Sequence, residues 1–312
     1  MWIASVIVFA LLLDMLLAEP RRGHPLVGFG VLVQGYEKWA RRLSMAESGA
    51  GQLVLGALGV IMLVMVPLLL LWLLQRMLPD YGQWLLDVVI LYLAIGASSL
   101  VDHARRVVRP LRENDLPAAR SAVARMVSRD TAALDETGIA SATVESVLEN
   151  GNDAVFASLF WYLLLGAPAV LVHRLLNTLD AMWGYRTTDY NYFGRTAARL
   201  DDVMAYVPAR LTALSYSLLG KTASAWRAWR QQAAACASPN SGPVMAAGAG
   251  ALGVQLGGIS HYHGQPVTKP SLGYGRRAVA ADIDAAIAMI RKTIILWSGL
   301  IVLAGVVAVV WN

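Results

Sequence analysis

The stretch Leu53–Leu74 reads LVLGALGVIMLVMVPLLLLWLL, and it decides the class of the fold. It carries no charged residue over the ~20 positions that a helix needs to cross the hydrocarbon core of a bilayer. Pro67 breaks helices in water, but helices that span membranes tolerate it. The stretch therefore predicts a transmembrane helix.

The rest of the chain supports a membrane environment. Hydrophobic residues make up 57% of the sequence and charged residues 15%, whereas soluble domains carry about 25% charged residues. Further spanning helices are predicted near 2–18, 84–101 and 294–311, with Asp14 and Asp87 as polar interruptions. We predict an all-α, polytopic membrane protein, with residues 1–312 forming a single integral-membrane domain.

Two other apolar runs, 154–176 and 203–220, are ambiguous because they contain Arg174 and Arg210. An arginine at the centre of a bilayer costs ~2.5 kcal/mol or more. These runs either cross the membrane or form half-buried helices along a cavity.

The distribution of Lys and Arg predicts the orientation. The polar segments 19–51, 102–153 and 221–293 are rich in these residues, and 75–83 contains only Arg76. Basic loops stay in the cytoplasm, so we expect a multi-pass protein of the cell (inner) membrane with cytoplasmic helical regions over 102–153 and 221–293. The net charge of +5 reflects this topology and membrane lipids as partners, with no nucleic-acid partner.

Acidic residues gather just before the run 154–176. Glu145 and Glu149 are four apart and lie on one face of a helix, and Asp153 follows if the helix passes Gly151, where we expect it to break. Like charges at this spacing repel by a few tenths of a kcal/mol. Either a solvated face tolerates this repulsion, or a hard cation such as Mg²⁺ binds there.

Two more polar groups stand at apolar boundaries. Asn177 and Asp180 share a helix face at spacing i, i+3, and the pair Asp201 and Asp202 precedes an apolar run. These acids are either helix caps or members of a pocket that includes the Glu145 and Glu149 face.

The segment 238–258 reads SPNSGPVMAAGAGALGVQLGG. Its first residues predict a turn whose free N–H groups can attract an anion at the start of a helix, or a turn that serves packing alone. Gly250, Gly253 and Gly257 then permit close helix packing. SYSLLGKT at 215–222 lacks the first glycine and the preceding strand of a phosphate-binding loop, although Lys221 can still meet a phosphate.

Several motifs together resemble a known family. In chain order they are LLLDMLLAEPRRGHP, RDTAALDE, ESVLEN, NTLDAMWGY, FGRTAARLDDV, PARL, SPNSGPVMAAGAGALGVQLGG and YHG. The set resembles the adenosylcobinamide-phosphate synthases, the CobD/CbiB membrane proteins of cobalamin biosynthesis, over nearly the whole chain. The resemblance implies attachment of aminopropanol or its O-phosphate to a propionate carboxylate of adenosylcobyric acid, a ligase-type reaction.

The implied chemistry suggests roles for the candidate residues. A carboxylate needs activation before it forms an amide, so ATP and Mg²⁺ are the expected cofactors. The expected catalytic residues are Glu149, Asp180, Asn150 and Asn177. The expected metal ligands are Glu145, Glu149, Asp201 and Asp202. The expected groups for phosphate and cofactor are Arg129, Arg195, Lys221, Ser238, Asn240 and Gly242.

Two other classes of function stay open. A transporter or channel would use Asp14, Asp87 and Arg210 inside the membrane. A Mg²⁺-dependent prenyl or lipid transferase would use the acids around Asp180 and Asp201. Other late enzymes of cobalamin assembly are further expected partners, and so is a second copy of the chain through Gly253 and Gly257.

Overall fold

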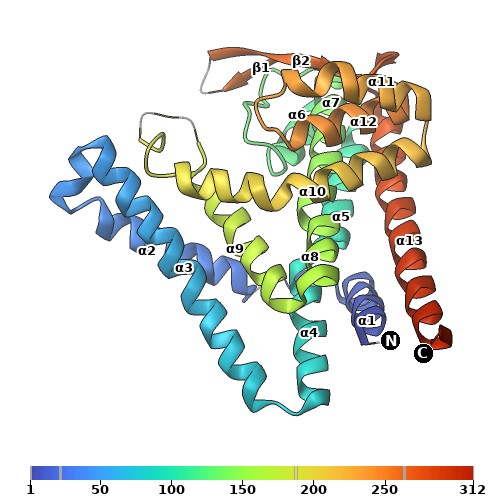
Figure 1. The fold of residues 1–312 in the computed structure, drawn as a ribbon. Coiled ribbons are helices and arrows are strands. Elements are labelled where there is room, and N and C mark those ends of the chain that lie inside the picture. The colour runs from blue at the N-terminus through green and yellow to red at the C-terminus, as the bar shows by residue number, and fades with distance from the viewer. Residues whose placement is uncertain (1, 21–22, 186, 188, 263–264, 312) are drawn as a thin grey trace. The chain divides into compact units, whose positions relative to one another are not determined.

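The computed structural model describes residues 2–20, 23–185, 187, 189–262 and 265–311, and helices dominate it (Figure 1). The predicted all-α class is confirmed, with one small sheet added. The chain divides into two compact units. Unit 1 comprises Met1–Gly96, Ala157–Ala205 and Ala308–Asn312, and unit 2 comprises Ala97–Phe156 and Tyr206–Val307.

Three stretches of the described chain are helical, long and apolar enough to cross a membrane. They are Gly49–Met77, Asp80–Arg112 and Ala280–Trp311, and the second is interrupted at Ile95 and Gly96, which are not helical. The helix α1 (Trp2–Leu17) is apolar but shorter, with 16 residues. The run 154–176 is not one helix, because Gly166 adopts a φ of +72° and separates α8 (Ala157–Leu165) from α9 (Ala167–Trp183).

Unit 1 is built from α1, α8, α9 and three further helices. These are α2 (Pro25–Ala40), α3 (Gly49–Met77) and α4 (Asp80–Ala94), and the short helix η1 (Ser44–Glu47) precedes α3. The pairs α1 with α4, α3 with α9, and α8 with α9 pack against each other. The buried core includes Phe29, Val33, Leu55, Val60, Leu176, Leu179, Trp183 and Phe193. This core positions α9, which carries Asn177 and Asp180.

Glu37 on α2 is the polar centre of this core. Its carboxylate accepts hydrogen bonds from the indole of Trp183 (3.0 Å), the hydroxyl of Tyr190 (2.9 Å) and Nε of Arg41 (2.8 Å). The Arg41 guanidinium also stacks over the rings of Tyr190 and Phe193. One carboxylate thus connects α2 to the end of α9 and to the segment that follows it.

We expect Glu37→Ala to lower the free energy of unfolding by about 1–3 kcal/mol for each buried donor left unpaired. Trp183 is the buried donor, and Tyr190 is a second, half-buried one. Denaturant titration of the purified protein, followed by tryptophan fluorescence, measures this effect. Glu47→Ala, on the exposed helix η1, is the control and should unfold like the wild type; equal stability of the two variants would contradict the role of Glu37.

Unit 2 surrounds a buried helix, α7 (Glu136–Gly151), whose residues from Ile139 to Leu148 are buried. The helices α5 (Ala97–Arg112), α6 (Leu116–Val123) and α12 (Ser241–Leu252) pack against it. The helix α11 (Thr222–Gln232) and the short η3 (Ala233–Ala235) pack on α12. The helix α10 (Arg195–Leu219) enters from unit 1, and α13 (Ala280–Trp311) ends the chain. Small residues make these contacts possible: a Cβ on Gly248 of α12 would collide with the side chain of Leu148 on α7.

Gly151 does not end the helix, contrary to our expectation. The chain continues from α7 into the π-helical turn η2 (Asn152–Phe156) and then into α8. Gly151 is needed here because a Cβ would collide with the side chain of Ile290. The turn keeps Asp153 next to the Glu145 and Glu149 face.

The region 221–293, which we predicted to be a helical region with a turn near 238–242, also contains a sheet. Strand β1 (Val254–Tyr262) pairs antiparallel with β2 (Gln265–Leu272) and parallel with β3 (Arg276–Arg277). Gly253 ends α12 with a φ of +72°, and Gly257 lies on β1 at a φ of +89° beside an irregularity in the pairing. These glycines therefore shape a turn and a bulge, so the expected helix pairing through Gly253 and Gly257 is wrong.

Candidate functional site

The Glu145 carboxylate is the most heavily bonded group on α7. Asp135 caps the start of α7 by accepting from the N–H of Gly138. Ser141 and Glu145 are four residues apart in this helix, so their side chains lie on the same face. The guanidinium of Arg129 donates directly to the Glu145 carboxylate, and the side chains are 8% and 4% exposed. Glu145 also accepts from Ser141 Oγ at 3.1 Å.

The β1–β2 hairpin completes this cluster. The N–H of Gly257 donates to Glu145 Oε1 at 3.0 Å, and Lys269 Nζ lies 3.6 Å from Oε2. Arg129 also donates to Ser260 Oγ at 3.3 Å. Burial by itself would raise the pKa of Glu145, but Arg129, Lys269 and these hydrogen bonds outweigh it and lower the pKa. Glu145 is thus an ionised anchor that ties the hairpin to α7.

Glu149, one turn further along α7, has the opposite electrostatics. Burial is the main cause that raises its pKa to about 7, and Asp153 and Glu145 add to it. Lys269 and Arg129 act against the shift but do not cancel it. A carboxyl that titrates near neutral pH is suited to accepting and releasing protons.

Neighbouring amides and hydroxyls hold this end of α7. Asn150 is exposed and donates to the carbonyl (2.8 Å) and hydroxyl (3.0 Å) of Ser146. Asn152 is buried, accepts from Thr212 Oγ1 at 2.9 Å and donates to Asp153 Oδ1 at 2.8 Å.

Sequence reasoning missed the roles of Asn152, Thr212 and Lys269. Asn152 stands three residues after Glu149, which is the spacing of one helix face, but we expected a break at Gly151. Lys269 is the only Lys or Arg between Val254 and Gly275, and its isolation was the available sign of a specific role.

The turn before α12 is polar, but two of the N–H groups that we expected to be free for an anion already have a partner within the turn. Ser238 Oγ accepts from the N–H groups of Asn240 (3.2 Å) and Ser241 (3.3 Å). Arg210 donates to Asn240 Oδ1 at 2.7 Å and to the carbonyl of Pro239 at 2.9 Å. Gly242 lies against the carbonyl of Ala233, where a Cβ would collide.

Cys236 shows that this turn is close to the α7 carboxylates. Burial is the main cause that raises its pKa, and Glu149 and Glu145 raise it further, while Lys269 acts in the opposite direction. Lys221, by contrast, packs on Gly253 at the far end of α12, a helix of 12 residues that is about 18 Å long at 1.5 Å per residue. The turn that holds Cys236 is thus within electrostatic range of the α7 carboxylates, and Gly242 lies against Cys236, whereas Lys221 packs at the other end of α12.

Unit 1 brings together part of the second predicted group. Asn177 donates to Asp201 Oδ1 at 3.4 Å, and Arg174 donates to Asn177 Oδ1 at 3.5 Å. Asp180 lies against Gly184, where a Cβ would collide with its carboxylate. Arg195 is turned toward its own segment, where it donates to the carbonyl of Asn191 and stacks on the ring of Tyr192.

The predicted metal ligands do not form a cluster within the described residues. No three His, Cys, Asp or Glu side chains gather there in a way that could hold a metal ion. Glu145 and Glu149 belong to unit 2, whereas Asp201 and Asp202 belong to unit 1. Their convergence on one cation remains a prediction.

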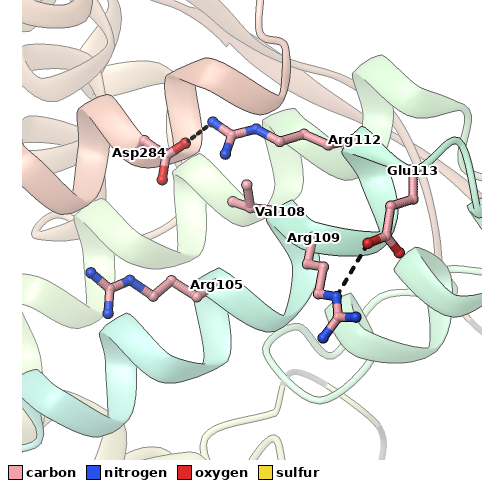
Figure 2. Close-up of a pocket in the computed structure, with 6 residues that line it drawn as sticks. All are labelled: Arg105, Val108, Arg109, Arg112, Glu113 and Asp284. Atoms are coloured by element: carbon pink, nitrogen blue, oxygen red, sulfur yellow. Dashed lines mark hydrogen bonds and ion pairs between the residues drawn. The ribbon is translucent and has the colours of Figure 1, made fainter.

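A separate hollow of about 360 Å³ lies between α5 and the start of α13, and Figure 2 shows its lining. Arg112 pairs with Asp284 at 2.5 Å and Arg109 with Glu113 at 3.2 Å. None of the predicted site residues lines it. Because two of its arginines are neutralised by carboxylates, we assign the hollow to the surface of the unit and not to the site.

Two of the three residues that a transporter would use, Asp87 and Arg210, make contacts that hold the structure together; Asp14 is buried in α1. Asp87 accepts from the hydroxyl of Tyr162 at 2.8 Å. Arg210 holds the turn before α12, as described above. Their contacts supply a packing reason for both residues.

Known proteins resemble the chain along almost its full length. The family model described as CobD/Cbib protein matches residues 7–290. A cobalamin biosynthesis protein CobD of Chromobacterium violaceum is 50% identical over 304 residues, which are 97% of each chain. Proteins with the same name from Stutzerimonas stutzeri and Mycobacterium tuberculosis are 51% identical (93% of this chain, 94% of the relative) and 39% identical (91% and 90%). No solved structure matches the chain. The chain therefore belongs to the CobD/Cbib protein family.

Proposed function

We propose that this protein forms an amide bond in cobalamin biosynthesis. In this proposal it joins aminopropanol, or its O-phosphate, to a propionate carboxylate of adenosylcobyric acid, with ATP as co-substrate, at the cytoplasmic face of the inner membrane. The names of the relatives support the pathway, and the candidate membrane spans support the location.

The observation that carries the proposal is the pair of unlike carboxyls on α7. Glu145 is kept ionised by Arg129 and Lys269, and Glu149 titrates near pH 7 one turn away. An amine nucleophile arrives with a proton that must leave, and a base with a pKa near the working pH is best suited to take it. Glu149 is that base in our proposal.

The reaction is proposed in two steps. A carboxylate oxygen of the corrinoid attacks the γ-phosphorus of ATP, which gives an acyl phosphate and ADP. The amine nitrogen then attacks the acyl carbon, its proton passes to Glu149, and phosphate leaves with the electron pair of the C–O bond. Holding the amine close to the acyl carbon can contribute about 7–11 kcal/mol to lowering the barrier.

Anionic groups of the substrates would meet the polar turn at 238–242. Ser238 Oγ already takes the N–H groups of Asn240 and Ser241, so the support is the dipole at the start of α12, which favours negative charge, and the electrostatic effect of Glu149 on Cys236 in the same turn. Arg129 is paired with the Glu145 carboxylate. We therefore propose that it positions Glu145 and does not bind the substrate. Arg195 and Lys221 make contacts with other segments, on Asn191 and Tyr192 and on Gly253, so a contact of either with a substrate phosphate would require its side chain to turn.

Mg²⁺ fits the chemistry of this end of α7, where Asp153 lies beside Glu149 and raises its pKa; Asp153 would hold the cation, which leaves Glu149 available as the base. Such ions often use one or two carboxylates together with substrate phosphates. When bound, Mg²⁺ would neutralise charge on the transferred phosphoryl group. Asp201 and Asp202, together with Asn177 and Asp180, would serve as further ligands and as groups that orient the amide.

An omission series tests the proposal. Purified full-length protein is incubated with adenosylcobyric acid, aminopropanol O-phosphate and MgATP, and each component is left out in turn while cobinamide phosphate is measured. We expect product only in the complete mixture, and aminopropanol in place of its phosphate reports which amine is preferred. Product formed without ATP would contradict the proposal, and so would an inactive complete mixture containing folded protein.

A further inference from the structure

The second half of α10 carries an exposed apolar stripe. Val207, Leu211, Leu214 and Leu218 are 48%, 37%, 40% and 62% exposed. Their spacings of four, three and four residues place them on one face of the helix. Four large aliphatic side chains in a row at the surface are unfavourable in water, so the stripe needs an apolar partner.

The opposite face of α10 is already occupied by its own unit. Ala209, Thr212, Ala213 and Tyr216 are fully buried. Tyr216 donates to the carbonyl of Leu148, and Thr212 donates to Asn152. Because these bonds fix how the helix is turned, the stripe faces away from the core of unit 2.

A contact with α13 fixes the depth of α10 relative to the predicted membrane. Trp297 Nε1 donates to Ser215 Oγ at 3.0 Å. Trp297 is three residues into the apolar run that starts at Ile294, which is about 4.5 Å at 1.5 Å per residue. Arg291 and Lys292, just before this run, are exposed. Ser215 therefore lies beside α13 near the boundary between water and hydrocarbon.

The course of α10 and its charge oppose a crossing. Figure 1 shows α10 running across the direction of α13. Arg210 keeps its guanidinium on the polar turn at Pro239 and Asn240, whereas a crossing helix would carry that charge into the bilayer at a cost of ~2.5 kcal/mol or more.

We propose that α10, from Tyr206 to Leu219, lies in the plane of the membrane interface with its Val207–Leu218 stripe in contact with lipid acyl chains. Amphipathic helices of this kind bury their apolar face about 5–10 Å into the boundary between headgroups and acyl chains. Thr212 on this helix bonds Asn152, the neighbour of Asp153, so the inference also attaches the α7 carboxylates to the membrane surface. It does not depend on the reaction proposed above.

Depth measurement by spin labelling tests this placement. Single cysteines replace Val207, Leu211, Leu214 and Leu218 in a Cys236→Ala background, because Cys236 is the only natural cysteine. Nitroxide labels are attached, and the full-length protein is reconstituted into vesicles of phosphatidylcholine and phosphatidylglycerol. The ratio of collision rates with oxygen and with a water-soluble nickel chelate reports depth. Leu300→Cys and Val307→Cys on α13, both at exposed positions, supply the pattern of a crossing helix.

We expect the four α10 labels to report one shallow depth, equal within about 5 Å, roughly half a helix diameter, and to collide with oxygen more than with the nickel chelate. The two α13 labels should differ by about 10 Å, which is seven residues at 1.5 Å each. A steady gradient of about 16.5 Å over the eleven helical rises from Val207 to Leu218 would show a crossing helix and overturn the inference. Frequent collision with the nickel chelate at all four positions would show that the stripe faces water and would overturn the inference. Dipolar broadening between labels on two copies, together with low oxygen access, would show that a second chain covers the stripe and would overturn it as well.

Discussion

Glu149→Gln is expected to lower the rate of amide formation by at least about 100-fold, the lower range of what a positioned base contributes. The amide of glutamine has nearly the same shape as the carboxyl but cannot take the proton of the amine. Burial and Asp153 already hold much of Glu149 in its neutral form near pH 7. The neutral substitute should therefore leave the fold intact, and the loss should appear in kcat.

The pH dependence gives this prediction a second readout. A base acts only when ionised, so wild-type activity should rise with pH and level off above about 7, the pKa of Glu149. The residual activity of Glu149→Gln should lack this rise. Rates measured between pH 5.5 and 8.5 under saturating substrates would show it.

The matched control is Glu136→Gln in the first turn of the same helix, at an exposed position. It removes the same charge from α7 away from the site and should keep near-normal turnover. If both variants were as active as the wild type, Glu149 would not be the base.

Glu145→Gln is expected to lower the free energy of unfolding by about 3–5 kcal/mol, the usual effect of removing one partner from a buried ion pair. The change leaves Arg129 buried without its counter-ion and removes the anchor of Lys269 and Gly257. Denaturant titration in detergent micelles measures the change. Replacing both Arg129 and Glu145 with methionine should recover much of the loss, because no buried charge then remains unpaired.

Acid should weaken the same pair. The folded-state pKa of Glu145 is lowered from its ordinary value of 4.5. Its stabilisation is therefore present above pH 4.5 and is lost as the pH falls through the lower folded value. The difference between wild type and Glu145→Gln should shrink over that range.

The exposed pair Arg109–Glu113, with side chains 83% and 60% exposed, is the control for Glu145. Glu113→Gln should cost less than about 1 kcal/mol, as surface pairs do. Equal losses in Glu145→Gln and Glu113→Gln would contradict the anchoring role.

Local patterns predicted the elements of unit 2 that depend on neighbouring residues. The spacing of Glu145 and Glu149 predicted their shared helix face, and the residue types at 238–242 predicted a polar turn. Hydrophobic length predicted the three stretches that are long and apolar enough to span a membrane, whereas the fourth predicted span, near 2–18, forms a shorter helix. The helix face and the spanning stretches depend on residues within a few positions of each other, and so do the bonds of Ser238 in the turn, so the sequence displays them directly.

The features that sequence reasoning missed depend on partners distant in the chain. The helix continues past Gly151 because Ile290 and Tyr216 pack closely against that glycine. The strand over Val254–Tyr262 forms because β2 and β3 pair with it, although its glycines are poor strand formers. Similarly, the spacing between Glu145 and Glu149 did not reveal that Arg129 and Lys269 would balance the negative charge of Glu145.

The most direct test of the proposed reaction follows oxygen atoms. Adenosylcobyric acid carrying ¹⁸O in the reacting carboxylate is converted with ATP and aminopropanol O-phosphate, and the released phosphate is analysed by mass spectrometry. Activation as an acyl phosphate predicts one ¹⁸O atom in inorganic phosphate for each amide formed, because the C–O bond breaks when the amine attacks. Amide formation with ¹⁸O in AMP, or with none in phosphate, would contradict the account.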